Sequence, residues 1–405
     1  MSRTVGLPRG QAEIDAFSDI LSDSLNFPPR SQADAMARYE SGDLRLVREG
    51  DRVAGGLVLI RTGQYFGRER VPMTGIHAVA VAPEERGSGA GRTLLDQVVR
   101  ELARPGGPPL ACLFPATQPL YRSVGFEQAG TFTQYRVPIG SLPIGPHDLA
   151  VERLPADTAA VADQLGPIYG RWARRQTGFV DRTEWFWRRQ VDPLGGEQRL
   201  TYAVRERGAI SGYLTLRRRW QTGGHVYQDV LCRELCAETP AALRRLTTLL
   251  ADERSLGQTL FINGPPAPVD HMILTEQSAA VHFQIRWMLR ILDVAAALEG
   301  RGYPPGLATS VGFEVEDELV EANRGHFSLE VAGGRGRVTR TSSAASGAGV
   351  GRRLVIGVRG LASLFSGYAP ADELARVGLA TGSDDAVAAA TALFAGPSPW
   401  LPEIF

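Results

Sequence analysis

The chain has 405 residues, 43% of them hydrophobic, so it is long enough to bury more than one core and is expected to form two or three domains. Its 44 basic residues are all arginine and are balanced by 44 acidic residues, which leaves no overall charge to attract nucleic acid or an anionic membrane. The lack of lysine excludes Schiff-base, pyridoxal phosphate, Walker-type hydrolase and protein kinase chemistry, because each needs a lysine amine.

The three cysteines, Cys112, Cys232 and Cys236, are too few and too odd in number for a disulfide framework, which favours a reducing compartment. The amino terminus lacks a continuous apolar core, and no later stretch stays apolar for about 18 residues. A soluble, cytoplasmic protein is therefore expected. No metal site is predicted, because Cys232, Cys236 and His225 lack a fourth ligand and their spacing fits alternating strand positions.

The first third predicts a helical start, a strand meander and then a strand, glycine loop and helix in that order. A turn-rich stretch from Gly140 reads as a linker, so the first domain is placed at residues 1–140. The expected helices are 12–25, 33–39, 92–102 and 119–123, and the expected strands are 44–48, 53–61, 72–81, 110–115 and 131–139.

Residues 141–286 repeat that layout without the glycine loop, which predicts a second copy of the same fold. Helices are expected at 157–174, 182–190 and 241–250, and strands at 200–205, 209–218 and 225–235. The aromatic cluster Trp185, Phe186 and Trp187 is expected to serve helix packing.

Residues 287–405 predict a mixed sheet with packed helices. After an apolar segment at 288–293, helices are expected at 294–301, 361–366 and 383–394, with alternating strands and a turn region at 333–351. The fold class is therefore α/β with mixed sheets.

The glycine loop follows the strand segment Val79-Ala80-Val81-Ala82-Pro83 and opens a helix. Backbone amides at such a place can bind phosphate without a cationic side chain, aided by the helix dipole. A dinucleotide fingerprint would need glycine where Arg92 stands, and a Walker loop would need a lysine. Both interpretations fail.

The pattern Arg86-x-x-Gly89-x-Gly91 resembles the pyrophosphate loop of the GCN5-related N-acetyltransferase (GNAT) superfamily, whose preceding strand pairs with the pantetheine arm of acetyl-CoA. The resemblance implies acetyl-CoA as acetyl donor. It implies these contacts: Val79, Ala80, Val81, Arg86, Gly87, Ser88, Gly89, Ala90, Gly91, Arg92 and, from a later loop, Thr117. Family members commonly carry a serine where this chain has Ala116 beside Thr117.

A second motif, Leu120-Tyr121-Arg-Ser-Val-Gly-Phe126-Glu127, resembles the short helix whose tyrosine faces the thioester sulfur in that superfamily. Attack of an amine on a thioester expels a thiolate, and a phenol with a pKa near 10 can give it a proton. Tyr121 is the predicted general acid.

Over its whole length, the chain resembles the enhanced-intracellular-survival (Eis) family of bacterial acetyltransferases: two acetyltransferase-like halves, a sterol-carrier-like domain and a terminal phenylalanine. The resemblance implies acetylation of aminoglycoside amines, a homohexamer, and a terminal carboxylate, here that of Phe405, in the active site. An α-carboxyl group with a pKa near 3.5 is a weak base, so its predicted role is orientation and proton relay as much as base catalysis.

The predicted acceptor pocket would attract a polyamine through the acidic residues Asp19, Asp23 and Glu403. Phe27 is the fourth residue predicted for this pocket. Two alternatives stay open. One is an acetyltransferase acting on protein lysines, and the other is a lipid or small-ligand binding protein with an apolar cavity in residues 290–405 and a structural acetyl-CoA site.

Overall fold

The computed structural model of the chain describes residues 3–25, 36–191, 199–221, 226–341 and 351–405. They form two compact units, one made of the chain up to Gly130 with Arg286–Pro399 and Phe405, the other of Thr131–Ile285 and Trp400–Ile404. Two strands, β6 (Glu127–Pro138) and β12 (Ala280–Ile291), run through the chain positions where the units divide. Of the helix expected at 33–39, residues 33–35 lie outside the described residues, as do Phe27 and His225, and the expectation was wrong for residues 37–39, which are not helical.

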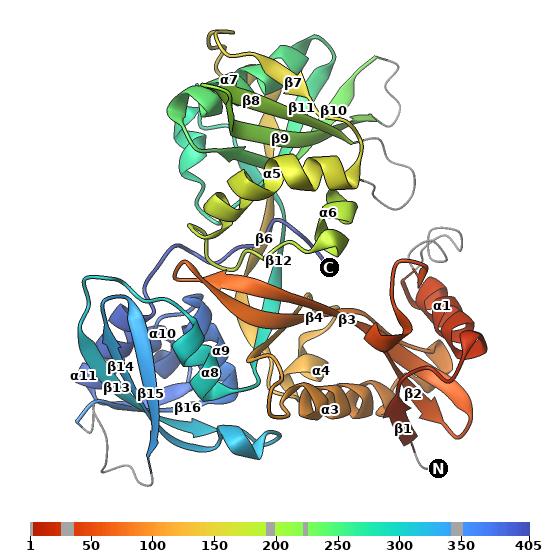
Figure 1. Cartoon of the computed structure of the whole chain (residues 1–405), viewed down its shortest axis with the longest axis vertical. Coiled ribbons are helices and arrows are strands. Elements are labelled where there is room, and N and C mark those ends of the chain that lie inside the picture. The colour runs from red at the N-terminus through yellow and green to blue at the C-terminus, as the bar shows by residue number, and fades with distance from the viewer. Residues whose placement is uncertain (1–2, 26–35, 192–198, 222–225, 342–350) are drawn as a thin grey trace. The chain divides into compact units, whose positions relative to one another are not determined.

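The N-terminal part of the first unit is the predicted meander with its helices (Figure 1). Its strands follow in the order β1-β2-β3-β4-β5-β12, and β4 and β5 are parallel. The strands are β1 (Arg3–Gly6), β2 (Leu44–Glu49), β3 (Arg52–Phe66), β4 (Glu69–Val81) and β5 (Leu110–Leu113), and the helices are α1 (Gln11–Leu25), α3 (Ala90–Leu102) and α4 (Gln118–Arg122).

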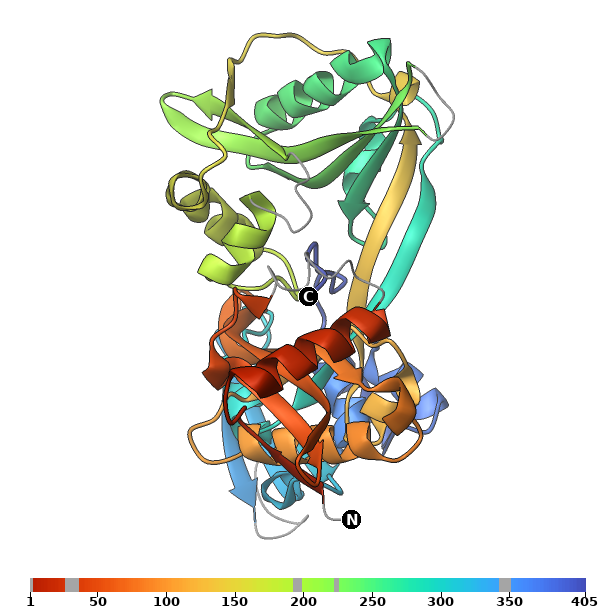
Figure 2. The same cartoon turned by 90° about the vertical axis from the view of Figure 1, so that its right-hand side faces the viewer.

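Alternation along β2 and β3 places one helix on each face of this sheet (Figures 1 and 2). Leu46 and Val58 pack with Phe17 of α1, whereas their neighbours Val47 and Leu57 pack into the cluster that holds the apolar side of α3. Successive strand residues point to opposite faces, so the sequence pattern alone sends two apolar layers in two directions.

The C-terminal part of the first unit is a five-stranded sheet in the order β15-β14-β13-β16-β17. Helices α9 and α11 pack against its central strands, around buried Phe313, Leu329 and Leu354. The elements are α8 (Val294–Gly300), β13 (Thr309–Glu316), β14 (Gly325–Ala332), β15 (Arg335–Thr341), β16 (Arg353–Gly357), α9 (Val358–Ser366), α10 (Ala371–Arg376), β17 (Ala380–Gly382) and α11 (Asp384–Leu393).

The expectation of a turn region over 333–351 was wrong for residues 335–341, which form β15. Gly333 and Gly334, with φ of +58° and +80°, make a two-residue turn that pairs Ala332 with Arg335. Consecutive glycines in this conformation are typical of a tight hairpin, so the glycines connect two strands here.

The second unit repeats the layout of the first, as predicted. Antiparallel β8, β9 and β10 are followed by α7 and by β11, which is parallel to β10, just as α3 connects β4 to the parallel β5. No glycine loop precedes α7. The side chain of Thr239 caps the start of this helix by accepting a hydrogen bond from the Ala242 amide. The remaining elements are β7 (Val151–Arg153), α5 (Thr158–Ala173), α6 (Glu184–Val191), β8 (Leu200–Glu206), β9 (Ala209–Trp220), β10 (Gln228–Ala237), α7 (Pro240–Ala251) and β11 (Gly257–Gly264).

Two smaller predictions concern this unit. Cys232 and Cys236 are both buried as thiols in strand β10, as expected, but a shift of register between Cys232 and Glu234 interrupts the simple alternation between them. Phe186 and Trp187 of α6 are buried, and the Trp187 ring packs edge-on against Tyr169 of α5 with centroids 5.6 Å apart.

Candidate active site

Strands β4 and β5 separate from one another in the middle of β4. They pair over three residues, ending with Gly75 opposite Cys112, but β4 continues to Val81. On its other edge β4 stays paired with β3 to the end. The backbone of β4 beyond Gly75 therefore has an edge to which an extended ligand can add as a strand would.

A β-bulge lies in that same stretch of β4. The pairing shifts between Gly56 and Val58 of β3, so that Leu57 faces two residues of β4, and one of them, Ala78, has φ of +53°. A bulge leaves the extra residue outside the ladder and bends the strand. Backbone polar groups of β4 are thereby turned out of the sheet where the two strands part.

The glycine loop leads from β4 into α3. Gly87 and Gly89 have φ of +76° and +91°, a region that glycine adopts without strain, and Gly89 is the residue before the first turn of α3. The first amides of a helix have no partner within the helix. The loop is exposed, and the side chain of Arg3 fixes it by donating a hydrogen bond to the Ser88 carbonyl at 2.7 Å. Amides held in this way can accommodate a phosphate.

Tyr121 and the loop converge on the end of β4. A Cβ placed on Gly91 would come within 3.4 Å of Val81 and 3.5 Å of Leu120, the residue before Tyr121. Tyr121 is itself buried in the cluster against which Val79 and Val81 pack. Strand, loop and tyrosine, predicted separately from sequence, therefore meet at one place.

Burial keeps the phenol of Tyr121 protonated. It raises the pKa of Tyr121 to about 12. A phenol with so high a pKa stays protonated at neutral pH and can therefore donate a proton to a leaving thiolate, but it is a weaker acid than a water-exposed phenol. The side chain is held edge-on to Phe126, with ring centroids 6.3 Å apart.

Phe405 packs at the point where the strands part. Its ring lies edge-on to Phe114, which follows β5, and a Cβ on Gly75 would come within 2.8 Å of it. Phe405 is buried, in contrast to the usual fate of a chain end. The sequence placed Phe405 by resemblance alone, whereas here it contacts the strand that precedes the glycine loop.

Within the second unit, the residues before Phe405 are fixed by hydrogen bonds. The Trp400 amide donates to the Thr177 carbonyl at 3.0 Å, and Arg189 donates to the Ile404 carbonyl at 2.9 Å. Arg182 donates to Glu403 at 2.5 Å. The tail is therefore held in a single course up to residue 404.

Glu403 differs from the exposed acid that a polyamine pocket suggests. It is buried, and it shares Arg182 with Glu234. Burial raises the pKa of Glu403, and repulsion from Glu234 adds to that effect while Arg182 opposes it. Burial alone would lower the pKa of Arg182, but the two carboxylates hold it well above its usual value.

The other predicted substrate residues lie on or near α1. Asp19 and Asp23 are both exposed on this helix, whereas Phe27 lies outside the described residues. The predicted loop residues Arg86 and Arg92 are exposed, as is Thr117, the residue that precedes α4. Ala80 is buried towards α1, so it can contact a ligand on the far side of β4 only through its backbone.

Sequence reasoning missed Gly75, Phe114 and Ala78. A glycine inside a strand pattern indicates a close approach by another group, so Gly75 carried a readable signal. Phe114 and the bulge at Ala78 carried none, because both depend on the pairing of strands distant in sequence.

Neither membrane-spanning helices nor clusters of metal-binding side chains occur in the described ranges. No helix there combines the length and apolar character that crossing a membrane requires. In the same part of the chain, His, Cys, Asp and Glu side chains do not gather in threes or more as they would around a metal ion.

Comparison with known families matches three segments of the chain. Residues 8–129 and 178–291 each match an acetyltransferase (GNAT) domain, and residues 294–402 match a sterol carrier protein domain. The two matched acetyltransferase segments correspond to the two copies of the β-meander, helix and parallel strand seen in the fold.

The chain is similar to several proteins along most of its length. It is 30% identical to an uncharacterized N-acetyltransferase of Streptomyces griseus, over 84% of this chain and 83% of the relative. It is 27% identical to N-acetyltransferase Eis of Mycobacterium tuberculosis, over 78% of this chain and 73% of that protein.

Solved structures resemble the fold over the full chain. A GCN5-related N-acetyltransferase from Anabaena variabilis superposes with a TM-score of 0.92 at 30% identity, covering 100% of both chains. A GCN5-related N-acetyltransferase from Kribbella flavida gives 0.85 at 28% identity, covering 100% of this chain and 99% of that one. Eis1 of Mycobacterium abscessus shares the fold, with a TM-score of 0.77 at 24% identity over 100% of both chains.

Proposed function

Because the chain belongs to the GCN5-related N-acetyltransferases and is similar to N-acetyltransferase Eis, we propose that it transfers the acetyl group of acetyl-CoA to amines of aminoglycosides or similar polyamines. The observation that carries the proposal is the convergence of the β4 edge, the glycine loop and buried Tyr121 at the place where β4 and β5 part.

The residues present fit acetyl-CoA. The amides at the start of α3, with Gly87 and Gly89 in conformations that bring backbone close to a ligand, suit a pyrophosphate. The edge of β4 from Ile76 to Val81 suits the amides of a pantetheine arm. Bound there, acetyl-CoA would supply an activated acyl group.

Tyr121 and Phe405 divide the proton transfers between them. As the C–N bond forms and the C–S bond breaks, the Tyr121 hydroxyl gives its proton to the departing sulfur. The α-carboxylate of Phe405 orients the attacking amine and passes the proton lost by nitrogen to solvent. Its low intrinsic basicity suits relay better than abstraction from an ammonium ion.

A polycationic acceptor is favoured over a neutral amine by the charge on α1. Asp19 and Asp23 lie four residues apart and are therefore on one side of the helix, and both are exposed. Glu13 of the same helix is already paired with Arg48. We assign Asp19 and Asp23 to attraction of the acceptor, with no part in the chemistry.

The test follows thiol release from acetyl-CoA with a panel of aminoglycosides, for wild type and Tyr121→Phe. Wild type should turn over at least one aminoglycoside, and Tyr121→Phe should lose about 10² or more in kcat. Tyr135→Phe is the control, because Tyr135 donates to the Pro265 carbonyl in the second unit. If the protein acetylates lysine-containing peptides but turns over none of the aminoglycosides, the acceptor would be a protein lysine and not an aminoglycoside.

The binding-protein alternative is less well supported. A hollow of about 620 Å³ in the C-terminal domain is lined by the charged residues Glu330, Arg335, Arg337 and Arg352 among others. Three guanidinium groups do not suit an apolar lipid. If the protein binds acetyl-CoA but releases no thiol in the presence of any amine of the panel, this alternative would be favoured.

We also propose a cytoplasmic homohexamer. Residues 269–283 of the second unit expose large apolar side chains, including Met272 at 83% and Phe283 at 45%, which is characteristic of an association surface. The buried thiols of all three cysteines are consistent with a reducing compartment. Analytical ultracentrifugation of wild type and Met272→Glu tests the assembly. The wild type should sediment as a hexamer and Met272→Glu as a smaller species. A monomeric wild type would contradict the proposed hexamer.

A further inference from the structure

A fully buried ion pair lies in the first unit, away from the glycine loop. Arg290 of β12 has no exposed surface, and its Nη2 donates to both carboxylate oxygens of Asp317 at 2.8 Å. Burying two charges costs several kcal/mol unless their remaining donors and acceptors are satisfied. A pair of this kind is weak evidence for stability and better evidence for a fixed geometry.

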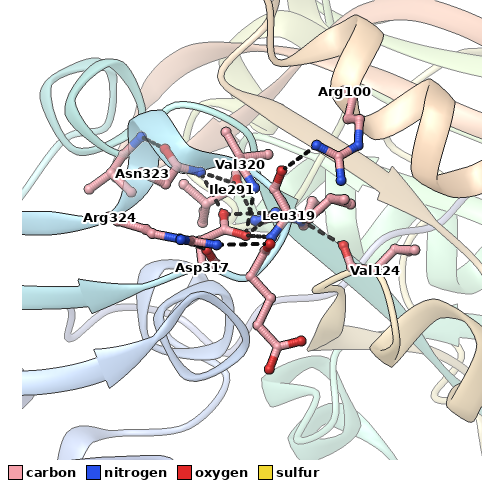
Figure 3. A network of polar contacts seen from close by, with 11 residues as sticks. Arg100, Val124, Ile291, Asp317, Leu319, Val320, Asn323 and Arg324 are labelled. Atoms are coloured by element: carbon pink, nitrogen blue, oxygen red, sulfur yellow. Dashed lines mark hydrogen bonds and ion pairs between the residues drawn. The ribbon is translucent and has the colours of Figure 1, made fainter.

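Asp317 is held on its other sides as well (Figure 3). The amides of Leu319 and Val320 donate to Oδ1 at 3.0 and 3.1 Å, and Asn323 donates to Oδ2 at 3.0 Å. With these bonds the carboxylate has one orientation. It therefore fixes the guanidinium of Arg290 in one orientation too.

One of the other nitrogens of Arg290, Nε, reaches the segment that follows Tyr121. Nε donates to the Val124 carbonyl at 2.9 Å, and Nη1 donates to the Ile291 carbonyl at 2.7 Å. Gly125 has φ of +89°, and a Cβ there would lie 2.7 Å from Nε. The turn after α4 is thus shaped to receive this guanidinium.

The same turn closes the helix that carries Tyr121. The amides of Val124 and Phe126 both donate to the Tyr121 carbonyl at 3.1 Å. A continuous series of buried hydrogen bonds therefore runs from Asp317 through Arg290 and Val124 to the backbone of Tyr121.

A second contact from the C-terminal part holds the next residues. Arg359 of α9 donates to Glu127 at 2.6 Å, and Glu127 also accepts from Arg122 at 2.7 Å. Ser363 donates to the Gln128 carbonyl at 2.5 Å. Residues 124–128 are consequently held at both ends by side chains from beyond residue 286.

We propose that the C-terminal part of the first unit is a positioning scaffold for the general acid: its Asp317 holds Arg290 of β12, and Arg290 is the positioning residue that fixes the Tyr121 helix through Val124. The proposal rests on the role of Tyr121 proposed above. Arginine is required because its planar fork meets Val124, Ile291 and Asp317 at once, which the single ammonium of lysine cannot do. This assigns the sterol-carrier-like domain a task that needs no bound lipid.

The test is Arg290→Lys, with Arg301→Lys as matched control. Arg301 is likewise a buried arginine of the first unit, and its hydrogen bonds go to the Phe365 and Gly302 carbonyls and not to residues 121–128. Arg290→Lys should lower kcat about 10- to 100-fold with the KM for acetyl-CoA unchanged, because a small misplacement of an acid costs rate and not binding. Arg301→Lys should lose about as much thermal stability as Arg290→Lys but should leave kcat unchanged. Equal kcat losses in both variants would overturn the proposal.

A second arm combines Arg290→Lys with Tyr121→Phe. If Arg290 acts through Tyr121, the double variant should be no slower than Tyr121→Phe alone. Multiplied losses would overturn the positioning role while leaving the role of Tyr121 intact, whereas full activity of Tyr121→Phe by itself would overturn the proposed general acid and the scaffold with it. Should Arg290→Lys not fold, Asp317→Asn, which keeps the shape and weakens the hold on Arg290, takes its place with the same expected outcomes.

Discussion

The ring of Phe405 lies edge-on to that of Phe114, with centroids 5.8 Å apart and planes at 86°. Phe114 directly follows β5, so this contact ties residue 405 to the strand that parts from β4 just beyond Gly75. The Phe405 ring is thereby held near the place where acyl transfer is proposed.

Extending the chain by two residues, Gly-Ser, after Phe405 should abolish most turnover. The extension converts the α-carboxylate into an amide and moves the charge away, while the ring can keep its contact with Phe114. Steady-state kinetics should show at least about a 10²-fold loss in kcat. Phe405→Leu is the control, since it keeps the carboxylate and should lose less. Full activity of the extended chain would exclude a role for the carboxylate.

Gly75→Ala should disturb the same site from the strand side. A Cβ there would lie 2.8 Å from the Phe405 ring, so the ring must move. About a tenfold loss in kcat/KM for the amine is expected, because positioning of a catalytic group is sensitive to small displacements. Gly63→Ala on β3 is the control, since its Cβ would meet the flexible side chain of Arg70 instead. Similar kinetics of the two variants would contradict the placement of Phe405.

Gly89→Ala should weaken binding of acetyl-CoA. Gly89 has φ of +91°, which costs a residue with a side chain about 1 kcal/mol or more, so the loop should relax away from the ligand. Calorimetric titration with acetyl-CoA should show about a tenfold higher Kd, with kcat little changed. Gly106→Ala is the matched control. Gly106 has φ of +83° in an exposed turn after α3, so alanine is similarly strained there but lies outside the predicted ligand loop. A Kd raised equally in both variants would contradict the assignment of the loop.

Glu13 should contribute to stability at neutral pH and lose that contribution in acid. Hydrogen bonds from Arg48 lower the pKa of Glu13 from 4.5 to about 2. Because the folded pKa lies below the unfolded one, the stabilisation is present above pH 4.5 and is lost as pH falls towards 2. Glu13→Gln should therefore lower the free energy of unfolding by about 1 kcal/mol at pH 7, a value discounted for partial exposure, and by less at pH 3.

Urea titrations at the two pH values measure this difference. Glu84→Gln is the control, because its carboxylate is 64% exposed beside Arg52. The same loss for Glu13→Gln at both pH values would show that packing of α1, and not the charge of Glu13, is responsible.

The sequence by itself determined most elements of the first domain, β1 excepted, and it determined the residues of the predicted ligand loop. Period-two alternation along β2 and β3 and the apolar side of α3 are local patterns, and they specify strands, helix and buried faces without knowledge of the tertiary structure. Glycine at 87, 89 and 91 is likewise a local requirement of a loop that approaches a phosphate. The same local logic misjudged residues 335–341, where Gly333 and Gly334 connect two strands.

Only the tertiary structure decided which distant residues share the site. The parting of β4 from β5, the packing of Phe405 on Gly75 and the pairing of Glu403 with Arg182 join residues far apart in the chain. Arg290 and Asp317 are 27 residues apart, and Val124 is 166 residues from Arg290. No local pattern encodes such contacts, because they depend on which surfaces the packed elements bring together once their apolar faces are buried.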